Sequence, residues 1–410
     1  MQLLILARFA ADPIDTLVFP VISTVIAAGI ITAFAISLRR LQRLWHRSRR
    51  VKDISTTAIP DISVARKYDA TVERIVHLRS LVKPPITLVG AVYLDIVLYP
   101  VETKQLEHHE WTDIDPLLIG PGGAAYFVGR YLYQNFNRQS FLFSGFGSAA
   151  DILSNSLCTM IADEEWVEND LDEFVGDSQS AISVHLVQRD HAQTSVFTHR
   201  GAVASLRWSQ VADRVRSAVR GGGIVLISGY FKTQLQVGLR AELKQLHAQN
   251  ALVIADPGSI DSSSTDRNQL SNLREELQAG LIDVHVSGYK DFLRVYGIVA
   301  GDRYPRNLEE LKSRIPSVAS KLAPLVFIRG TDLPDGLSVI SIANGTICAA
   351  VSDASTVTHT APISAKNGFT AALIDTLLSS APTQSAAGSI EELATKCATL
   401  GLQGWKDACT

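Results

Sequence analysis

The residues of this chain that could do chemistry stand where short apolar runs end. Asp95 lies five residues beyond Gly90, which closes the apolar run 86–90. A carboxylate in that place can accept hydrogen bonds from the vicinal hydroxyls of a sugar, although an Asp that caps a turn at a strand end is an equally good interpretation. The glycine-rich segment 120–123 opens a helical run, where glycine lets the backbone approach a ligand at a helix N-terminus.

The elements that would position these residues follow a regular alternation. Short apolar runs bounded by Gly, Asp or Pro are typical of buried strands, and amphipathic segments lie between them. This alternation predicts an α/β fold with a mostly parallel sheet and helices on both faces, in which ligands bind beyond the carboxyl ends of the strands. The predicted strands are 86–90, 141–147, 224–230, 251–258 and 325–330, and the predicted helices are 205–220, 233–249, 266–280 and 307–321.

Three other segments have their own patterns. Segments 92–102 and 181–199 alternate as exposed strands do and lack helices, which predicts a small antiparallel appendage able to cover a pocket. The segment 62–81 has apolar residues at three- and four-residue spacing and is followed by Lys83-Pro84-Pro85, which predicts a helix that stops there. It could be a linker between a membrane anchor and the domain, or an ordinary helix packed on the domain.

Taken in order, these segments resemble the PfkB family of ribokinase-like carbohydrate kinases. The likeness covers about residues 86–380 and implies a three-layer α/β/α sandwich with a small antiparallel β lid, in a domain that spans residues 85–410. It also implies that Asp95, Gly122 and Gly123 bind the sugar. The segments that carry the resemblance are ITLVGAVYLDIV, GPGGAAYFVGRYL, FLFSGFGSAAD, THRGAVASL, IVLISGY, ALVIADPG and APISAKNGFTAALIDTLL.

The second family signature is altered in this chain. In the family it is a Gly-Ala-Gly-Asp turn whose backbone amides form the anion hole for the transferred phosphoryl group, and whose Asp is the general base. The matching positions here are Ser364, Ala365, Lys366 and Asn367. An amide cannot act as a carboxylate base, and loss of a general base typically costs about 10²–10⁴-fold in rate.

Other elements that the resemblance assigns to phosphoryl transfer are altered too. The family's Asn-x-x-Glu element, which organises magnesium and phosphates, corresponds to the segment from Ser287 to Lys290, and an ammonium in place of the acid removes metal affinity. Phe127 replaces the Asn of the first signature, and the nucleotide-side Thr-x-Gly turn is reduced to segment 328–330. The damage is therefore concentrated on the phosphoryl-transfer side, while Asp95 on the sugar side remains.

These departures predict a pseudokinase that keeps a pocket for a sugar or nucleoside and acts as a sensor or scaffold. An active ATP-dependent carbohydrate or nucleoside kinase with an atypical base is the alternative, and only this alternative requires ATP and magnesium as cofactors. A purely structural partner protein with a vestigial pocket is the third possibility. The resemblance further implies a homodimer formed through the lid.

The N-terminal part of the chain predicts a membrane anchor. A short segment, 1–15, comes first. Residues 16–38 then contain no charged side chain and are mostly Leu, Val, Ile, Ala and Phe. At about 1.5 Å per residue the stretch from residue 17 to 38 covers roughly 33 Å, enough for a transmembrane helix. A signal peptide or a buried core helix fits less well, because the run is too long for the first and too uniformly apolar for the second.

Basic residues follow this run directly, in segment 39–52. A linker segment then extends to residue 84. By the positive-inside rule the basic residues place the following domain in the cytoplasm, with a single pass through the inner membrane. Residues 16–52 would then contact membrane lipid. The basic residues are Arg39, Arg40, Arg43, Arg47, Arg49, Arg50 and Lys52.

Composition excludes several other classes of protein. The chain has 38 basic and 41 acidic residues and a net charge of −3 at pH 7, which does not favour nucleic-acid binding through a global positive field. Its four cysteines form no CxxC pair, which argues against a zinc site or a disulfide framework. The cluster His108-His109-Glu110 has no second ligand set at metal spacing, so we predict a polar turn and no metal site.

Overall fold

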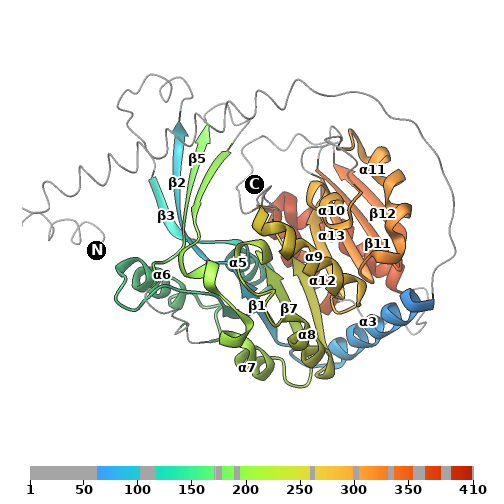
Figure 1. Ribbon diagram of the computed structural model, residues 1–410, viewed down its shortest axis with the longest axis horizontal. Coiled ribbons are helices and arrows are strands. Elements are labelled where there is room, and N and C mark those ends of the chain that lie inside the picture. Colours follow the sequence, from blue (N-terminus) through green and yellow to red (C-terminus); the bar gives the residue numbers. More distant parts are fainter. Residues whose placement is uncertain are drawn as a thin grey trace, which may run out of the picture. The chain divides into compact units, whose positions relative to one another are not determined.

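The computed structural model describes residues 62–101, 117–169, 171, 178–188, 194–258, 264–298, 304–330, 337–353, 365–379 and 389–408. These residues form an eight-stranded sheet and a four-stranded sheet (Figure 1). The strand order of the larger sheet is β12-β11-β10-β9-β8-β7-β1-β4, and that of the smaller sheet is β3-β2-β5-β6. The predicted α/β fold with a smaller antiparallel sheet is thus confirmed.

The larger sheet is parallel from β4 to β10, and β11 and β12 continue it in antiparallel pairing. Every residue of β1, β7, β8, β10 and β11 is buried, as expected for strands covered on both faces. The strands are β1 (Ile86–Gly90), β4 (Phe141–Phe143), β7 (Gly223–Ser228), β8 (Ala251–Asp256), β9 (Val284–Gly288), β10 (Leu325–Gly330), β11 (Leu337–Ala343) and β12 (Thr346–Asp353).

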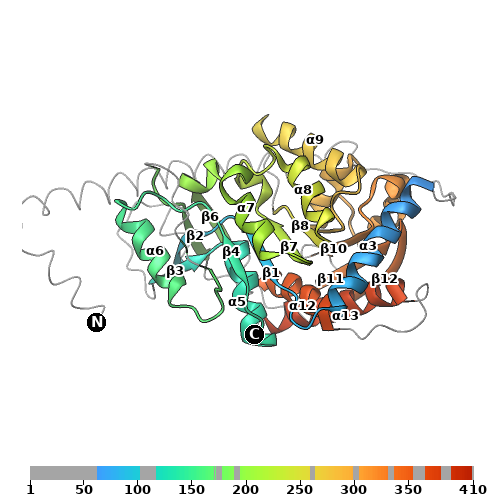
Figure 2. The same cartoon turned by 90° about the horizontal axis from the view of Figure 1, so that it is seen from below.

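Helices cover both faces of this sheet (Figure 2). Alternate residues of each strand belong to different cores: Leu226 packs in the core shared with α5, α12 and α13, and Val225 packs in the core shared with α7, α8 and α10. This is the period-two alternation of a strand between two apolar layers. The helices are α5 (Ala124–Phe136), α6 (Ile152–Ala162), α7 (Trp208–Ala218), α8 (Leu239–Ala248), α9 (Ser264–Gln278), α10 (Tyr289–Tyr296), α11 (Leu308–Arg314), α12 (Ala365–Ser379) and α13 (Ser389–Asp407).

The smaller sheet consists of β3 (Leu117–Gly122), β2 (Tyr93–Val101), β5 (Ile182–Gln188) and β6 (Thr194–His199). It confirms the antiparallel strands predicted in segments 92–102 and 181–199. The strand β3 was not predicted, because its glycine-rich end resembles a loop in sequence. Among the described residues β3 pairs on one side only, and three consecutive apolar side chains on it are about half exposed: Leu117, Leu118 and Ile119 at 51%, 53% and 53%.

The helix α3 (Ile62–Ser80) packs on the domain. Ile75 and Leu78 are buried in the core beside α12 and α13. The helix lies along the amino ends of the parallel strands, because its polar residues contact groups that immediately precede strands: His77 Nε2 lies 2.8 Å from the carbonyl oxygen of Gly221, close before β7.

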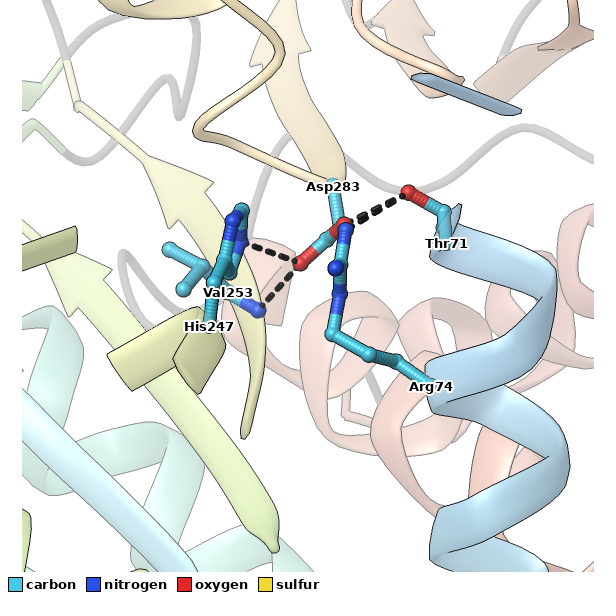
Figure 3. Close-up of polar contacts among 5 residues, drawn as sticks. All are labelled: Thr71, Arg74, His247, Val253 and Asp283. Carbon is cyan, nitrogen blue, oxygen red and sulfur yellow. Dashed lines mark hydrogen bonds and ion pairs between the residues drawn. The ribbon is translucent and has the colours of Figure 1, made fainter. Parts of the chain in front are cut away.

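A buried carboxylate fastens α3 to the amino edge of the sheet (Figure 3). Asp283, directly before β9, accepts hydrogen bonds from Thr71 Oγ1 at 2.5 Å and from the guanidinium of Arg74, both on α3. Its other oxygen is 3.1 Å from His247 Nε2 and accepts a 2.8 Å bond from the amide of Val253. Burial alone would raise the pKa of Asp283, but the hydrogen bond from His247 and the charge of Arg74 outweigh it and lower the pKa.

Some predicted elements have different bounds. The helix expected over 307–321 is α11 followed by a 3₁₀ turn, η3 (Ile315–Lys321), and the strand expected over 141–147 ends at Phe143. Within the described part of the chain no helix is long and apolar enough to cross a membrane. The predicted transmembrane helix 16–38 and the basic segment 39–52 lie outside the described residues.

Candidate functional site

Asp95 lies in β2, opposite Gly120 of β3, and is 9% exposed. Its carboxylate rests directly on the backbone of Gly122, where a Cβ would come within 1.8 Å of Asp95 Oδ2. Any larger residue at position 122 would therefore displace the carboxylate. Burial raises the pKa of Asp95, and the neighbouring His185, whose Nε2 is 3.4 Å from Oδ1, partly opposes that shift.

Gly123 connects this carboxylate to a helix N-terminus. It is the N-cap of α5 and has φ +95°, a conformation that favours glycine, and a Cβ there would lie 2.4 Å from the carbonyl oxygen of Ala91. The backbone of Ala91, just after β1, and the backbone at the start of α5 are therefore in direct contact, with no room for a side chain between them. Asp95, Gly122 and Gly123, to which the family resemblance assigns sugar binding, are close together in the structure.

The start of α12 holds residues that the family resemblance assigns to the second signature. Asn367 is buried, at 3% exposed, and its Oδ1 has no hydrogen-bond partner among the described residues. Gly368 lets α12 and α13 touch through their backbones, since a Cβ there would lie 2.4 Å from the carbonyl oxygen of Gly404. Ser364 and the side chain of Ala365 lie outside the described residues.

A buried ion pair closes against this first turn of α12. Arg329 Nη2 donates to Asp256 Oδ1 at 2.9 Å, and Arg329 Nη1 donates to the carbonyl oxygen of Lys366 at 3.0 Å and lies 3.3 Å from Thr370 Oγ1. Thr370 in turn donates to Asp256 Oδ2 at 3.0 Å. Both charged side chains are 6% exposed. The guanidinium thus joins the ends of β8 and β10 to α12.

Charged groups of both signs surround the same helix N-terminus. Protein atoms packed around the Lys366 ammonium and the nearby Arg329 guanidinium lower the pKa of Lys366, and the carboxylates of Asp256 and Asp291 oppose this shift. Lys232, after β7, also disfavours the charged form of Lys366. Since the helix macrodipole adds a partial positive charge at this end, an anion there would be stabilised.

The segment that the resemblance assigns to the family's Asn-x-x-Glu element begins in β9. Ser287 is the second-last residue of that strand, and its buried Oγ has no partner among the described residues. Lys290, in the first turn of α10, places its ammonium 5.5 Å from the ring centre of Tyr289 and 5.9 Å from that of Tyr304, at cation–π distance. In the described ranges no cluster of three or more His, Cys, Asp or Glu side chains could hold a metal ion.

The two groups of residues lie along one edge of the sheet. A Cβ on Gly229, directly after β7, would lie 3.0 Å from the Cβ of Ala91 beyond β1, and the amide of Gly229 donates to the carbonyl oxygen of Asp256 at 3.2 Å. Since Ala91 also touches Gly123, a continuous series of turns joins the carboxyl ends of β1, β7 and β8. This is the edge at which ligands bind in open parallel sheets.

Sequence reasoning missed several of these residues. His185 belongs to a segment whose alternation looked like an exposed strand, and nothing in its spacing pointed to Asp95. Asp256 and Arg329 fell within the predicted strands 251–258 and 325–330 without a role in the site, because their pairing joins positions 73 residues apart. A buried Arg at the end of an apolar run was the one available signal, since a fully buried guanidinium requires an anionic partner.

Comparison with known proteins identifies the fold. No protein-family model matches the chain, and no curated protein matches it in sequence. Solved structures of PfkB-type kinases do match. A 2-dehydro-3-deoxygluconokinase from Thermotoga maritima has a TM-score of 0.57 at 15% identity, with 80% of this chain and 98% of that chain covered.

Two further structures give the same result. An adenosine kinase from Sinorhizobium meliloti has a TM-score of 0.56 at 15% identity, covering 78% of this chain and 93% of that one. A PfkB protein from Polaromonas sp. JS666 has a TM-score of 0.54 at 16% identity, covering 78% and 95%. At these identities the likeness establishes the fold, which is ribokinase-like.

Proposed function

We propose that this protein binds a small sugar or nucleoside beside Asp95 and transfers phosphoryl groups weakly or not at all. The observation that carries the proposal is Asn367, a buried amide at the position that the family resemblance gives to the general base. An amide has no proton-accepting capacity near neutral pH, so a substrate hydroxyl beside it would keep its proton. The related folds belong to kinases of a sugar acid and of a nucleoside, which fits this ligand class.

The ion pair beside α12 supports the loss of catalysis. In phosphoryl transfer the enzyme stabilises the charge that spreads over the transferred group, largely with positioned cations and amides. Arg329 has the right charge for that role, but it donates to Asp256, Thr370 and a backbone carbonyl within the protein. These hydrogen bonds hold the guanidinium at the carboxyl edge of the sheet, where its donors are used by the protein itself.

The alternative, an active kinase with an atypical base, has one observation in its favour. The N-terminus of α12, with Lys366 and Lys232 near it, would stabilise a phosphate, so nucleotide binding, with or without efficient transfer, is compatible with this end of the helix. ATP and magnesium are cofactors of the protein only in this case.

The proposal includes a location and two partners. We propose that residues 16–38 anchor the protein in the inner membrane with its domain in the cytoplasm, and that residues 16–52 contact lipid. We also propose that a second copy pairs along the exposed apolar strand β3. The protein would then report or scaffold at the membrane in response to a sugar or nucleoside.

Binding and turnover measured together test this proposal. Calorimetry with D-fructose, 2-dehydro-3-deoxygluconate and adenosine should detect binding, and Asp95→Ala should weaken it by about 1–3 kcal/mol, because the hydroxyl donors lose a charged acceptor. Asp213→Ala, whose side chain is 94% exposed, is the control and should bind as wild type. Equal affinity of Asp95→Ala and wild type would place the ligand elsewhere.

Turnover is the second measurement. Consumption of ATP should not rise when any of these compounds is added to the unaltered protein. Substantial sugar-dependent turnover that Asn367→Ala abolishes would overturn the proposal and favour the active kinase.

A further inference from the structure

His185 reaches Asp95 from the adjacent strand of the smaller sheet. It lies in β5, which pairs beside β2, and it is 5% exposed. Its Nε2 is 3.4 Å from Asp95 Oδ1 and 2.9 Å from Ser183 Oγ. The imidazole is therefore a buried polar neighbour of the carboxylate that the proposed function assigns to ligand hydroxyls.

The other ring nitrogen decides which proton the imidazole carries. Nδ1 of His185 is buried and has no hydrogen-bond partner among the described residues. A proton on Nδ1 would be a buried donor without an acceptor, which is unfavourable. An unprotonated Nε2 would direct its lone pair at the carboxylate, and the two would repel each other. A neutral ring with its proton on Nε2, shared between Ser183 and Asp95, avoids both the unpaired donor and this repulsion.

We propose that His185 is a positioning residue for Asp95: its Nε2–H holds the carboxylate against Gly122 while the ring stays neutral, so that Asp95 keeps its full negative charge for the ligand. The inference rests on the proposed function, because the ligand is the hydroxyl-bearing compound assigned there to Asp95. An imidazolium in the same place would neutralise the carboxylate and weaken its hydrogen bonds to hydroxyls. A neutral donor orients it without that loss.

The groups around Asp95 make the proposal measurable. Burial raises the pKa of Asp95, and His185, whose Nε2 lies 3.4 Å from Oδ1, is the one ionisable group among the described residues that acts on it in the other direction. Removal of the donor leaves burial unopposed, so Asp95 should hold its proton to a higher pH. A role in packing alone would not move that titration.

The first test follows Asp95 without any ligand. Full-length protein in detergent micelles, labelled with ¹³C at the Asp carboxyl carbons, is titrated by NMR, with the spectrum of Asp95→Asn to assign the signal. His185→Phe should raise the Asp95 midpoint by about one pH unit or more relative to wild type, and His185→Gln, which retains an N–H donor, should raise it less. His199→Phe, at an exposed histidine of β6 in the same sheet, is the control and should leave the Asp95 midpoint unchanged. Equal midpoints in wild type and both His185 variants would overturn the proposal.

The second test measures affinity for D-fructose and adenosine by calorimetry between pH 5 and 8. His185→Phe should bind about tenfold more weakly than wild type at the low end of this range and approach it at the high end, as Asp95 regains its charge. An equal loss at every pH would mark His185 as merely structural. A shifted titration without binding of either probe would support the link between His185 and Asp95 and refute the proposed function.

Discussion

At position 367, a restored carboxylate should bring back little phosphoryl transfer by itself. Asn367→Asp supplies a proton acceptor, but Lys366 still crowds the first turn of α12, and Lys290 still stands where the family has an acid. More turnover is expected when Lys366→Gly, Ser364→Gly and Lys290→Glu are added, because orientation, charge neutralisation and proton removal act as a unit. The assay is ATP consumption that depends on added fructose or adenosine. Full activity from Asn367→Asp alone would show that the remaining machinery is intact.

The pair of Arg329 and Asp256 predicts a pattern of stability changes. Arg329→Met leaves a buried carboxylate without its counter-ion, so the free energy of unfolding should fall by about 3–5 kcal/mol. Adding Asp256→Asn should recover much of that loss, since no unpaired charge then remains buried. Chemical denaturation followed by fluorescence measures both. Lys312→Met, which removes an ion pair with the exposed Glu309, is the control and should change stability by about 0–1 kcal/mol.

At the scale of elements, α3 should depend on the charge of Asp283. Asp283→Asn is expected to lower the free energy of unfolding by about 3–5 kcal/mol at pH 7, because Arg74 then lies buried without its anion. The pKa of Asp283 is lower in the folded than in the unfolded chain, so its contribution is complete above the unfolded value of about 3.9 and is lost as the pH falls through the folded value.

Denaturation at a series of pH values checks this sign. The difference between wild type and Asp283→Asn should stay constant from pH 7 to about 5 and shrink below about 4. Asp213→Asn, on an exposed side chain, should show no such difference. A difference that grows toward acid would mean that the network stabilises the protonated carboxyl.

The elements that sequence reasoning found and missed differ in a physical way. Strands such as β7 and β8 are continuous apolar runs, so composition alone predicts them. The strands β9 and β11 were not predicted, because each carries polar residues at buried positions: His285 in the first, and Ser338 and Ser341 in the second. Tertiary neighbours, such as Tyr296 beside His285 Nδ1 at 3.1 Å, accommodate such groups, and a single sequence does not show them.

The same limit applies to the candidate site. The glycines at 122 and 123 could be predicted, because only glycine tolerates such close approach and positive φ. The contact between His185 and Asp95 could not, since it depends on the register of two strands that are not consecutive in the chain. The order of motifs along the chain was enough to identify residues of the site, but the contacts between them depend on strand pairing that the sequence does not show.

At the scale of the whole molecule, the apolar strand β3 should determine self-association. Unpaired apolar edge strands tend to pair with a second chain. Leu118→Lys, on that edge, should convert the proposed dimer to a monomer in analytical ultracentrifugation. Val237→Lys, at a residue that is 53% exposed on another surface, should leave the dimer unchanged. Identical sedimentation of wild type and Leu118→Lys would exclude β3 as the contact.

The proposed anchor makes a separate prediction for the full chain. Full-length protein should remain with membranes after carbonate washing, and a chain that lacks residues 16–38 should be released, since the uncharged run is the proposed source of attachment. Release of the full chain into the aqueous phase would contradict the anchor.

The position of α3 has a consequence for biosynthesis. Tyr68 bonds to Glu391, 323 residues later, and Arg79 bonds to the carbonyl of Leu377, 298 residues later. At roughly 5–20 residues per second, a ribosome needs about 16–65 s to make the partner of Tyr68 after Tyr68 itself. During that interval the apolar side chains of α3, such as Ile75 and Leu78, lack the α12 and α13 residues against which they pack in the folded protein. Nascent chains of this protein should therefore need a chaperone at their N-terminal end until translation is nearly complete.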